Sequence, residues 1–226
     1  MSARKRVAVL ISGRGSNMLS LIAAAQASDY PAEIALVLSN RPDAPGLVTA
    51  REKGIAAIAL DHRACATREE FERVLQQKLE EHRIDLVCLA GFMRLLTPWI
   101  LSRWEGRMLN IHPALLPAYK GLHTHERALA DGVKIHGATV HFVVPEMDAG
   151  PIIAQAAVCV LDADTPGSLA ARVLAQEHVI YPLALRLVAS GAAKIVNGKV
   201  LTGVATTSAL VAPELRDMAA TLSGEP

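Results

Sequence analysis

The chain has 226 residues, of which 51% are hydrophobic and 20% are charged. This composition excludes a disordered protein and fits one large α/β domain or two small ones. Lys and Arg number 23 against 22 Asp and Glu, so the formal net charge is only +1. A general nucleic-acid-binding protein is therefore not expected, whereas a local cationic pocket for one anion remains open.

Three cysteines lie far apart in the sequence, and no apolar run approaches the length of a membrane span. Cys88 stands inside an apolar run, where a buried and inert thiol is expected. The basic N-terminal residues precede an apolar stretch that is too short for a signal peptide. We therefore expect a soluble protein of the reducing cytoplasm that does not contact a membrane.

The first half of the chain alternates short apolar runs with helical patterns. Strands are expected at 7–11, 34–38, 55–60 and 85–90, and helices at 16–27, 44–53 and 67–82. Thr67 is a typical N-cap residue, and acidic residues follow it in the first turn. Such an alternation predicts a parallel sheet that is covered by helices.

The second half is less regular. A strand at 108–111 leads into a proline-rich loop at 112–121 and a helix at 123–130, and strands at 139–144 and 152–161 are expected to pair antiparallel. Thr165-Pro166 opens a long helix that ends before Gly191, with Pro182 expected to kink or split it. A hairpin is expected at 194–202, and residues from 205 onward are interpreted as a loose tail.

A glycine-rich turn, residues 12–17, follows the first predicted strand. In a doubly wound sheet this turn binds phosphates, because the helix N-terminus offers unpaired N–H groups and a partial positive charge. Met18 replaces the third glycine of a dinucleotide fingerprint, Ser39-Asn40 stands where the ribose-binding acid would be, and a P-loop lysine is absent. A monophosphate is therefore favoured over NAD or ATP. The alternative is a turn that serves packing and helix capping, with Ser16 and Asn17 as caps.

Asn110 and His112 stand two residues apart on a predicted strand, so their side chains face the same side. An amide and an imidazolium together can hold a developing oxyanion in acyl transfer. Asp148 lies in a later loop, and a carboxylate near the imidazole would stabilise its charged form. Each residue alone also fits a structural role, at a strand end, before a proline or in a turn.

Metal binding and covalent catalysis are not expected. His123 and His125 are two residues apart on a predicted helix, so their side chains point in nearly opposite directions. No G-x-S-x-G motif occurs, and no cysteine has a basic neighbourhood that would activate it. Direct transfer without a metal is therefore favoured.

At these motifs the chain resembles the phosphoribosylglycinamide formyltransferases, the folate-dependent enzymes of purine synthesis. The likeness extends from Val7 to about Gly191. It rests on ISGRGSN at 11–17, LAGFMRLL at 89–96, NIHPALLP at 110–117, GLHTH at 121–125, HFV at 141–143 and QEH at 176–178.

The resemblance implies one formyltransferase domain over residues 1–226. Its fold would be α/β: a Rossmann-like, mostly parallel sheet with helices on both faces, then a C-terminal part with antiparallel strands and a long helix. Residues 1–106 would form the phosphate-binding half and 107–204 the catalytic and folate half, followed by the loose tail at 205–226. The substrates would be 10-formyltetrahydrofolate and 5′-phosphoribosylglycinamide. No metal would be required. The protein would be a monomer or a homodimer.

The same resemblance implies roles for particular residues. His112 would be the general acid, Asn110 its oxyanion partner and Asp148 the group that tunes His112. The substrate phosphate and ribonucleotide would be bound by Gly15, Ser16, Asn17 and Glu177, although an acid on a helix is more often solvated. The folate site would be lined by Arg68, Met93, Arg94, Leu95, Leu96 and Asn110, although Leu95 and Leu96 also fit a hydrophobic core.

Three positions depart from the family pattern. Arg14 fills the variable place in the glycine turn, Ala114 stands where many relatives carry serine, and Lys120 stands where proline is common.

Three rival functions remain for this sequence. A 10-formyltetrahydrofolate hydrolase shares the Asn-His-Asp site but usually carries an N-terminal regulatory domain, for which there is no room before Val7. A methionyl-tRNA formyltransferase would need an RNA-binding domain and a basic surface. A non-catalytic NAD-binding protein is disfavoured, because the third glycine of the turn and the ribose-binding acid are both missing.

Overall fold

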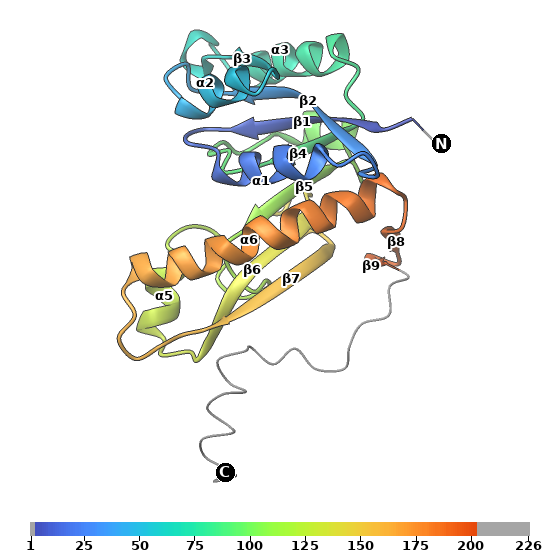
Figure 1. The fold of residues 1–226 in the computed structure, drawn as a ribbon. Helices are drawn as coiled ribbons and strands as arrows, with labels where there is room; N and C mark the ends of the chain where they lie inside the picture. The colour runs from blue at the N-terminus through green and yellow to red at the C-terminus, as the bar shows by residue number, and fades with distance from the viewer. Residues whose placement is uncertain (1–2, 203–226) are drawn as a thin grey trace.

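The computed structural model describes residues 3–202 (Figure 1). The strands are β1 (Lys5–Ile11), β2 (Ala32–Ser39), β3 (Ala56–Ala59), β4 (Leu86–Leu89), β5 (Met108–His112), β6 (Ile135–Phe142), β7 (Ile152–Cys159), β8 (Lys194–Val196) and β9 (Lys199–Leu201). The helices are α1 (Ser16–Ala25), α2 (Pro45–Glu52), the 3-10 helix η1 (His62–Ala64), α3 (Arg68–Glu81), α4 (Pro98–Arg103), α5 (Thr124–Ala130) and α6 (Pro166–Ala189).

One sheet of seven strands runs through the molecule in the order β3-β2-β1-β4-β5-β6-β7. The pairs from β3 to β5 are parallel, whereas β5–β6 and β6–β7 are antiparallel. The strand order reverses between β1 and β4, and ligands of such sheets bind beyond the carboxyl ends of the strands at this point. The predicted fold is confirmed, including its antiparallel C-terminal part.

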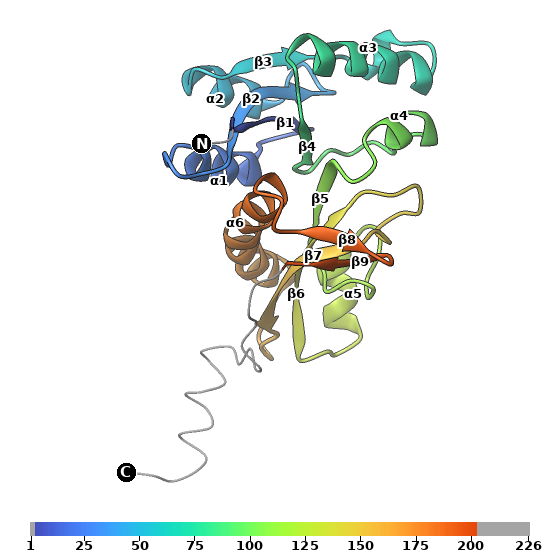
Figure 2. The same cartoon turned by 90° about the vertical axis from the view of Figure 1, so that its right-hand side faces the viewer.

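Helices cover both faces of the sheet (Figure 2). Val7, Val9 and Ile11 of β1 pack in the cluster formed with α1 and α6, while Ala8 and Leu10 pack in the cluster with α3 and α4. Successive residues of a strand point to opposite faces, so a strand buried on both sides must be apolar throughout. This explains the uninterrupted apolar run of β1.

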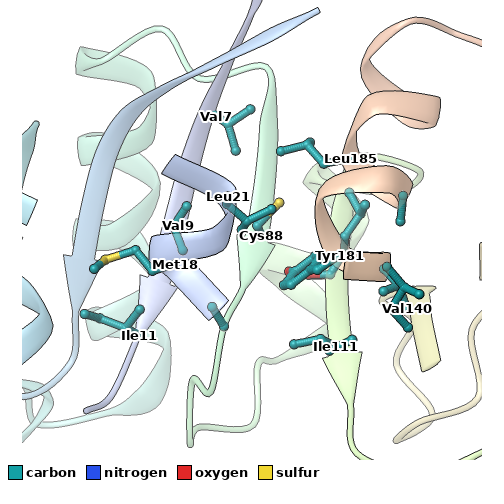
Figure 3. Close-up of a cluster of buried hydrophobic side chains, with 14 of the residues drawn as sticks. Val7, Val9, Ile11, Met18, Leu21, Cys88, Ile111, Val140, Tyr181 and Leu185 are labelled. Atoms are coloured by element: carbon teal, nitrogen blue, oxygen red, sulfur yellow. The ribbon is translucent and has the colours of Figure 1, made fainter. Parts of the chain in front are cut away.

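Helix α6 joins the two parts of the sheet. Thr165 caps it, Pro166 is its first residue, and Thr165 and Ser168 form a capping box. Pro182 was predicted to kink or split this helix; it does not split it, because α6 is continuous to Ala189. Pro182 removes one backbone hydrogen bond from α6, and the residue before it anchors the helix on the sheet: the Tyr181 hydroxyl, within the apolar cluster of Figure 3, donates toward the carbonyls of Leu89 and Leu109 at 3.0 and 3.3 Å.

Other differences are local. The predicted hairpin is confirmed as β8–β9, with Asn197 and Gly198 at positive φ, as a two-residue turn of this kind requires. Strand β6 begins at Ile135, before the predicted 139, and α4 lies where no element was predicted although Thr97-Pro98 is a helix-start signal. The predicted tail at 205–226 lies outside the described residues.

Candidate functional site

The glycine turn connects β1 to α1 at the point where the strand order reverses. Gly15 is the N-cap of α1 with φ 74°, and no side chain caps this helix. The idea that Ser16 and Asn17 serve as caps is therefore wrong. The first N–H groups of α1 are left without a side-chain acceptor, which is the arrangement that receives an anion at a helix N-terminus.

Asn17 and Glu177 meet although they lie 160 positions apart. Asn17 Nδ2 donates to Glu177 Oε2 at 2.6 Å, and Asn17 Oδ1 is buried without a partner. Glu177 is only 6% exposed, so the alternative of a solvated acid is wrong. Burial raises the pKa of the Glu177 carboxyl, and the bond from Asn17 partly offsets this. Packing of α1 against α6 thus places a carboxylate beside the glycine turn.

Asn110 and His112 lie on β5, the last parallel strand before the antiparallel part. His112 Nε2 lies 2.9 Å from the Tyr119 carbonyl oxygen, which can only accept, so Nε2 carries the proton of this bond. The other ring nitrogen, Nδ1, lies 3.5 Å from Asp148 Oδ2. Asp148 Oδ2 accepts from the Gly121 N–H at 2.8 Å. The structure therefore brings His112 and Asp148 together, with the loop at 119–121 contacting both.

Asn110 is held by His141, a residue that no sequence pattern placed in the site. Asn110 Nδ2 lies 3.2 Å from His141 Nε2, and His141 Nδ1 donates to the Phe142 carbonyl at 2.9 Å. Burial lowers the pKa of His141, so its ring is neutral near pH 7 and Nε2 accepts from the Asn110 amide. Asp148 Oδ1 is 3.9 Å from the same nitrogen. Asn110, His141, Asp148 and His112 thus form one continuous group.

The loop after β5 is anchored from the antiparallel strands. Thr139 Oγ1 donates to the Ala114 carbonyl at 2.6 Å and accepts from the Leu116 N–H at 3.0 Å. Gln155 Nε2 donates to the Leu116 carbonyl at 2.9 Å. Thr139 on β6 and Gln155 on β7 therefore fix the path of the chain toward the Tyr119 carbonyl that contacts His112.

The run at 93–96 lies in a loop between β4 and α4, and not in a strand. Met93 is 70% and Leu95 62% exposed, while Leu96 is half-buried against the cluster with α3. The Arg94 guanidinium lies 4.8 Å from the Phe71 ring centre. Two exposed apolar side chains in one short loop are more typical of a ligand surface than of a core.

Buried polar groups hold both ends of this loop. The Ser12 hydroxyl accepts from the Met93 N–H at 2.8 Å, and Glu72 Oε1 accepts from the Thr97 N–H at 2.6 Å. The structure thus joins the predicted folate loop to the glycine turn. Arg68 is separate: it is the first, exposed residue of α3, and within residues 3–202 it has no hydrogen-bond or ion-pair partner.

A buried histidine supports the loop that contacts His112. His136 on β6 is 1% exposed, and its ring packs edge-on against the rings of Tyr119 and His125, with centres 5.6 and 5.3 Å away. In the part of the chain that the structure describes, neither of its ring nitrogens has a well-formed hydrogen bond. Burial lowers the pKa of His136 to about 4.

This histidine makes the fold sensitive to acid. The imidazole of His136 has a pKa of about 6.5 in the unfolded chain and about 4 in the folded protein, so the unfolded chain binds the proton first as the pH falls. The free energy of unfolding should therefore fall as the pH drops from 6.5 to 4, by on the order of 2–3 kcal/mol from this group. In His136→Phe, urea unfolding at pH 7 and pH 5 should show a smaller difference than in the wild type. The exposed-site variant His123→Asn should keep the wild-type difference, and an unchanged difference in His136→Phe would contradict the assignment.

Among residues 3–202, no three His, Cys, Asp or Glu side chains lie where they could hold a metal ion together. No helix in the same range is both long and apolar enough to cross a bilayer. Cys65, Cys88 and Cys159 are free thiols. Burial raises the pKa of the Cys88 thiol to about 12, which agrees with an inert core cysteine.

The chain matches known formyltransferases over most of its length. Residues 5–185 match the formyl transferase family model. The phosphoribosylglycinamide formyltransferase of Escherichia coli (strain K12) is 46% identical over 189 residues, which cover 84% of this chain and 89% of that protein. The chain belongs to the phosphoribosylglycinamide formyltransferases.

Solved structures agree with this assignment. Glycinamide ribonucleotide transformylase 1 from Symbiobacterium toebii is 44% identical with a TM-score of 0.87, covering 89% of this chain and 95% of that chain. The human trifunctional purine biosynthetic protein adenosine-3 is 48% identical over 87% of this chain, which spans only 20% of that protein. A formyltetrahydrofolate deformylase from Pseudomonas syringae has the same fold, with a TM-score of 0.81, but is only 25% identical and 66% covered. The chain thus spans 89% of the length of the Escherichia coli protein and a fifth of the length of the trifunctional relative.

Proposed function

We propose that this protein transfers the formyl group of 10-formyltetrahydrofolate to the amine of 5′-phosphoribosylglycinamide, as a step of purine synthesis in the cytoplasm. The observation that carries the proposal is the position of His112, between the carboxylate of Asp148 and the Tyr119 carbonyl, with Asn110 on the same strand face. The strand β5 that carries Asn110 and His112 belongs to the same sheet as β1. The turn after β1 leads into the uncapped N-terminus of α1, which is suited to a phosphate.

In the proposed reaction the amine nitrogen attacks the formyl carbon, and the carbonyl oxygen becomes an oxyanion. Asn110 has a second amide hydrogen that His141 does not use, and this hydrogen donates to the oxyanion. His112 donates from Nε2, because Nδ1 faces Asp148. The intermediate collapses as the bond to folate N10 breaks, N10 takes a proton and the amine loses one. To donate to the substrate, the Nε2 proton of His112 must leave the Tyr119 carbonyl. The loop at 119–121 therefore has to move, or the proton has to be shared between the carbonyl and the substrate.

The two substrates occupy different ends of the site in this proposal. The phosphate of the ribonucleotide binds Gly15, Ser16 and Asn17 at the start of α1, and Glu177 accepts from the ribonucleotide. The folate lies along the exposed loop at 93–96, close to Asn110. Arg68 stays a proposed folate contact on the resemblance alone.

A coupled spectroscopic assay separates transfer from hydrolysis. The protein is mixed with 10-formyltetrahydrofolate, with and without 5′-phosphoribosylglycinamide, and formation of tetrahydrofolate is followed by absorbance. Product that appears only in the presence of the amine supports transfer. Equal turnover without the amine would overturn the proposal in favour of the hydrolase, which shares the Asn-His-Asp site.

The buried carboxylate of Glu177 is predicted to lower the free energy of unfolding and to strengthen binding of the ribonucleotide. A carboxyl whose folded-state pKa is raised destabilises the fold as the pH rises through that pKa, because the folded protein must then hold a buried charge. Glu177→Gln keeps an oxygen that accepts from Asn17, so its free energy of unfolding at pH 7 should exceed that of the wild type. The affinity for the ribonucleotide should fall by roughly 10- to 100-fold, as is expected when a charged acceptor is replaced by a neutral one.

Urea unfolding and calorimetric binding at pH 7 measure the two effects. Glu105→Gln, at an exposed site, should change neither quantity. A Glu177→Gln variant that binds the ribonucleotide as tightly as the wild type would remove Glu177 from the substrate site. A variant with reduced stability would contradict the cost assigned to the buried charge.

A further inference from the structure

A cavity of about 410 Å³ opens at the carboxyl ends of β1, β2 and β4, a size typical of small-ligand sites. It shares Met93 and Arg94 with the predicted folate loop, but it contains none of the residues of the group around His112 and neither Asn17 nor Glu177. Its remaining wall includes Ser12, Asn40 and His62. This is the edge of a doubly wound sheet at which ligands bind.

Asn40, directly after β2, is 3% exposed and its amide orientation is fixed. The Ser12 hydroxyl accepts from the Met93 N–H at 2.8 Å and has one hydrogen left to donate. It lies 2.5 Å from Asn40 Oδ1, which is normal for an O–H donor but too short for an N–H donor. The oxygen of the Asn40 amide therefore faces Ser12, and its NH2 group faces the other way.

Among residues 3–202, the NH2 group of Asn40 has no usable acceptor. It lies 3.3 Å from His62 Nδ1, but this nitrogen also lies 2.8 Å from the Asn40 carbonyl oxygen. A carbonyl oxygen only accepts, so His62 Nδ1 carries a hydrogen there and has no lone pair for the Asn40 amide. Asn40 thus presents an almost fully buried, unsatisfied double donor to the cavity, which is costly unless a ligand or water accepts from it.

The charges around the cavity favour an anion. Arg41 and Arg94 are in its wall, and no Asp or Glu is among the lining residues. Arg41 is paired with Asp43 at the exposed rim, with the closer contact at 3.2 Å, and such a pair is weak in water. Arg94 has no carboxylate partner within residues 3–202, and its guanidinium carbon lies over the Phe71 ring, 4.8 Å from the ring centre. Within the same residues its N–H groups have no hydrogen-bond acceptor, so they remain to donate.

From these contacts we infer that the cavity is a second anion site, distinct from the start of α1 at Gly15, Ser16 and Asn17, that binds the phosphate or carboxylate group of a small ligand. Asn40 Nδ2 and Arg94 donate to its oxygens, and Arg41 adds positive charge at the rim. The ligand must carry several hydrogen-bond acceptors, because the Asn40 NH2 group and the two guanidinium groups can only donate.

Nuclear magnetic resonance tests this site directly. The ¹⁵N-labelled protein is titrated with inorganic phosphate and, separately, with glutarate, and the Asn40 side-chain NH2 signals and the Gly13 and Gly91 amides are followed. One or both ligands should shift these signals in a saturable way. Asn40→Asp keeps the shape and the acceptor for Ser12 but loses the donors, and Arg94→Met keeps the alkyl stem. Both should weaken binding by about tenfold or more.

Controls make each outcome decisive. Arg73→Met removes one positive charge from α3 outside the cavity and should bind as the wild type does. Signals of Gly15 and Ser16 report separately on the start of α1 and should respond to phosphate equally in Asn40→Asp. Saturation by phosphate alone or by glutarate alone identifies the group that the site prefers. Absence of saturable shifts, or shifts that both variants leave unchanged, would show an adventitious ion only and would overturn the inference; Arg94→Met decides if Asn40→Asp fails to fold.

Discussion

His112→Ala is expected to lower the turnover of formyl transfer by roughly 10²–10⁴-fold, the range for loss of a general acid or of an oxyanion donor. The imidazole is held from both sides, by the Tyr119 carbonyl at 2.9 Å and by Asp148 at 3.5 Å, so its position is set before substrate binds. Alanine removes the only ionisable donor on this face of β5. The initial rate of tetrahydrofolate formation with both substrates saturating measures the effect.

The fold should survive this substitution, because the polar partners of the His112 ring, the Tyr119 carbonyl and Asp148, lie in loops. Circular dichroism and the urea midpoint should stay close to those of the wild type. His82→Ala, at the C-terminal cap of α3 far from the site, should retain full turnover. If His112→Ala kept near-normal turnover, His112 would have no part in the mechanism, and the proposed function would lose the observation that carries it.

Asn110→Ala should also lower turnover by roughly 10²–10⁴-fold, with little change in the affinity for either substrate in the ground state. The amide donates one hydrogen to His141 Nε2 and keeps the other for the oxygen that becomes charged during the reaction. The interaction is strongest in the transition state, so its loss should lower kcat more than it raises KM.

A double-mutant cycle separates the roles of Asn110 and His141. If His141 is a positioning residue that acts through Asn110, His141→Phe should lower kcat on its own but add little to the loss in Asn110→Ala. Additive losses would show that His141 acts on the reaction independently. Asn197→Ala, in the β8–β9 turn away from the site, is the matched asparagine control and should leave kcat unchanged.

Much of the fold could be predicted from local patterns. The apolar run of β1, the capped start of α6 at Thr165-Pro166 and the Asn197-Gly198 turn each depend on residues that are close in sequence. Local signals failed at Pro182, where a proline that usually interrupts a helix is tolerated because packing on the sheet outweighs the lost bond. They also failed at α4, whose short length gives little periodicity.

The sequence by itself determined the alternation of strands and helices, the glycine turn after β1 and the placement of Asn110 and His112 on one strand face. Only the tertiary structure decided what those side chains touch. The meeting of Asn17 with Glu177, the acceptor role of His141 and the unsatisfied amide of Asn40 depend on strand order, register and helix packing. These are set by contacts between distant segments, and no pattern of neighbouring residues encodes the distance between two atoms that packing brings together.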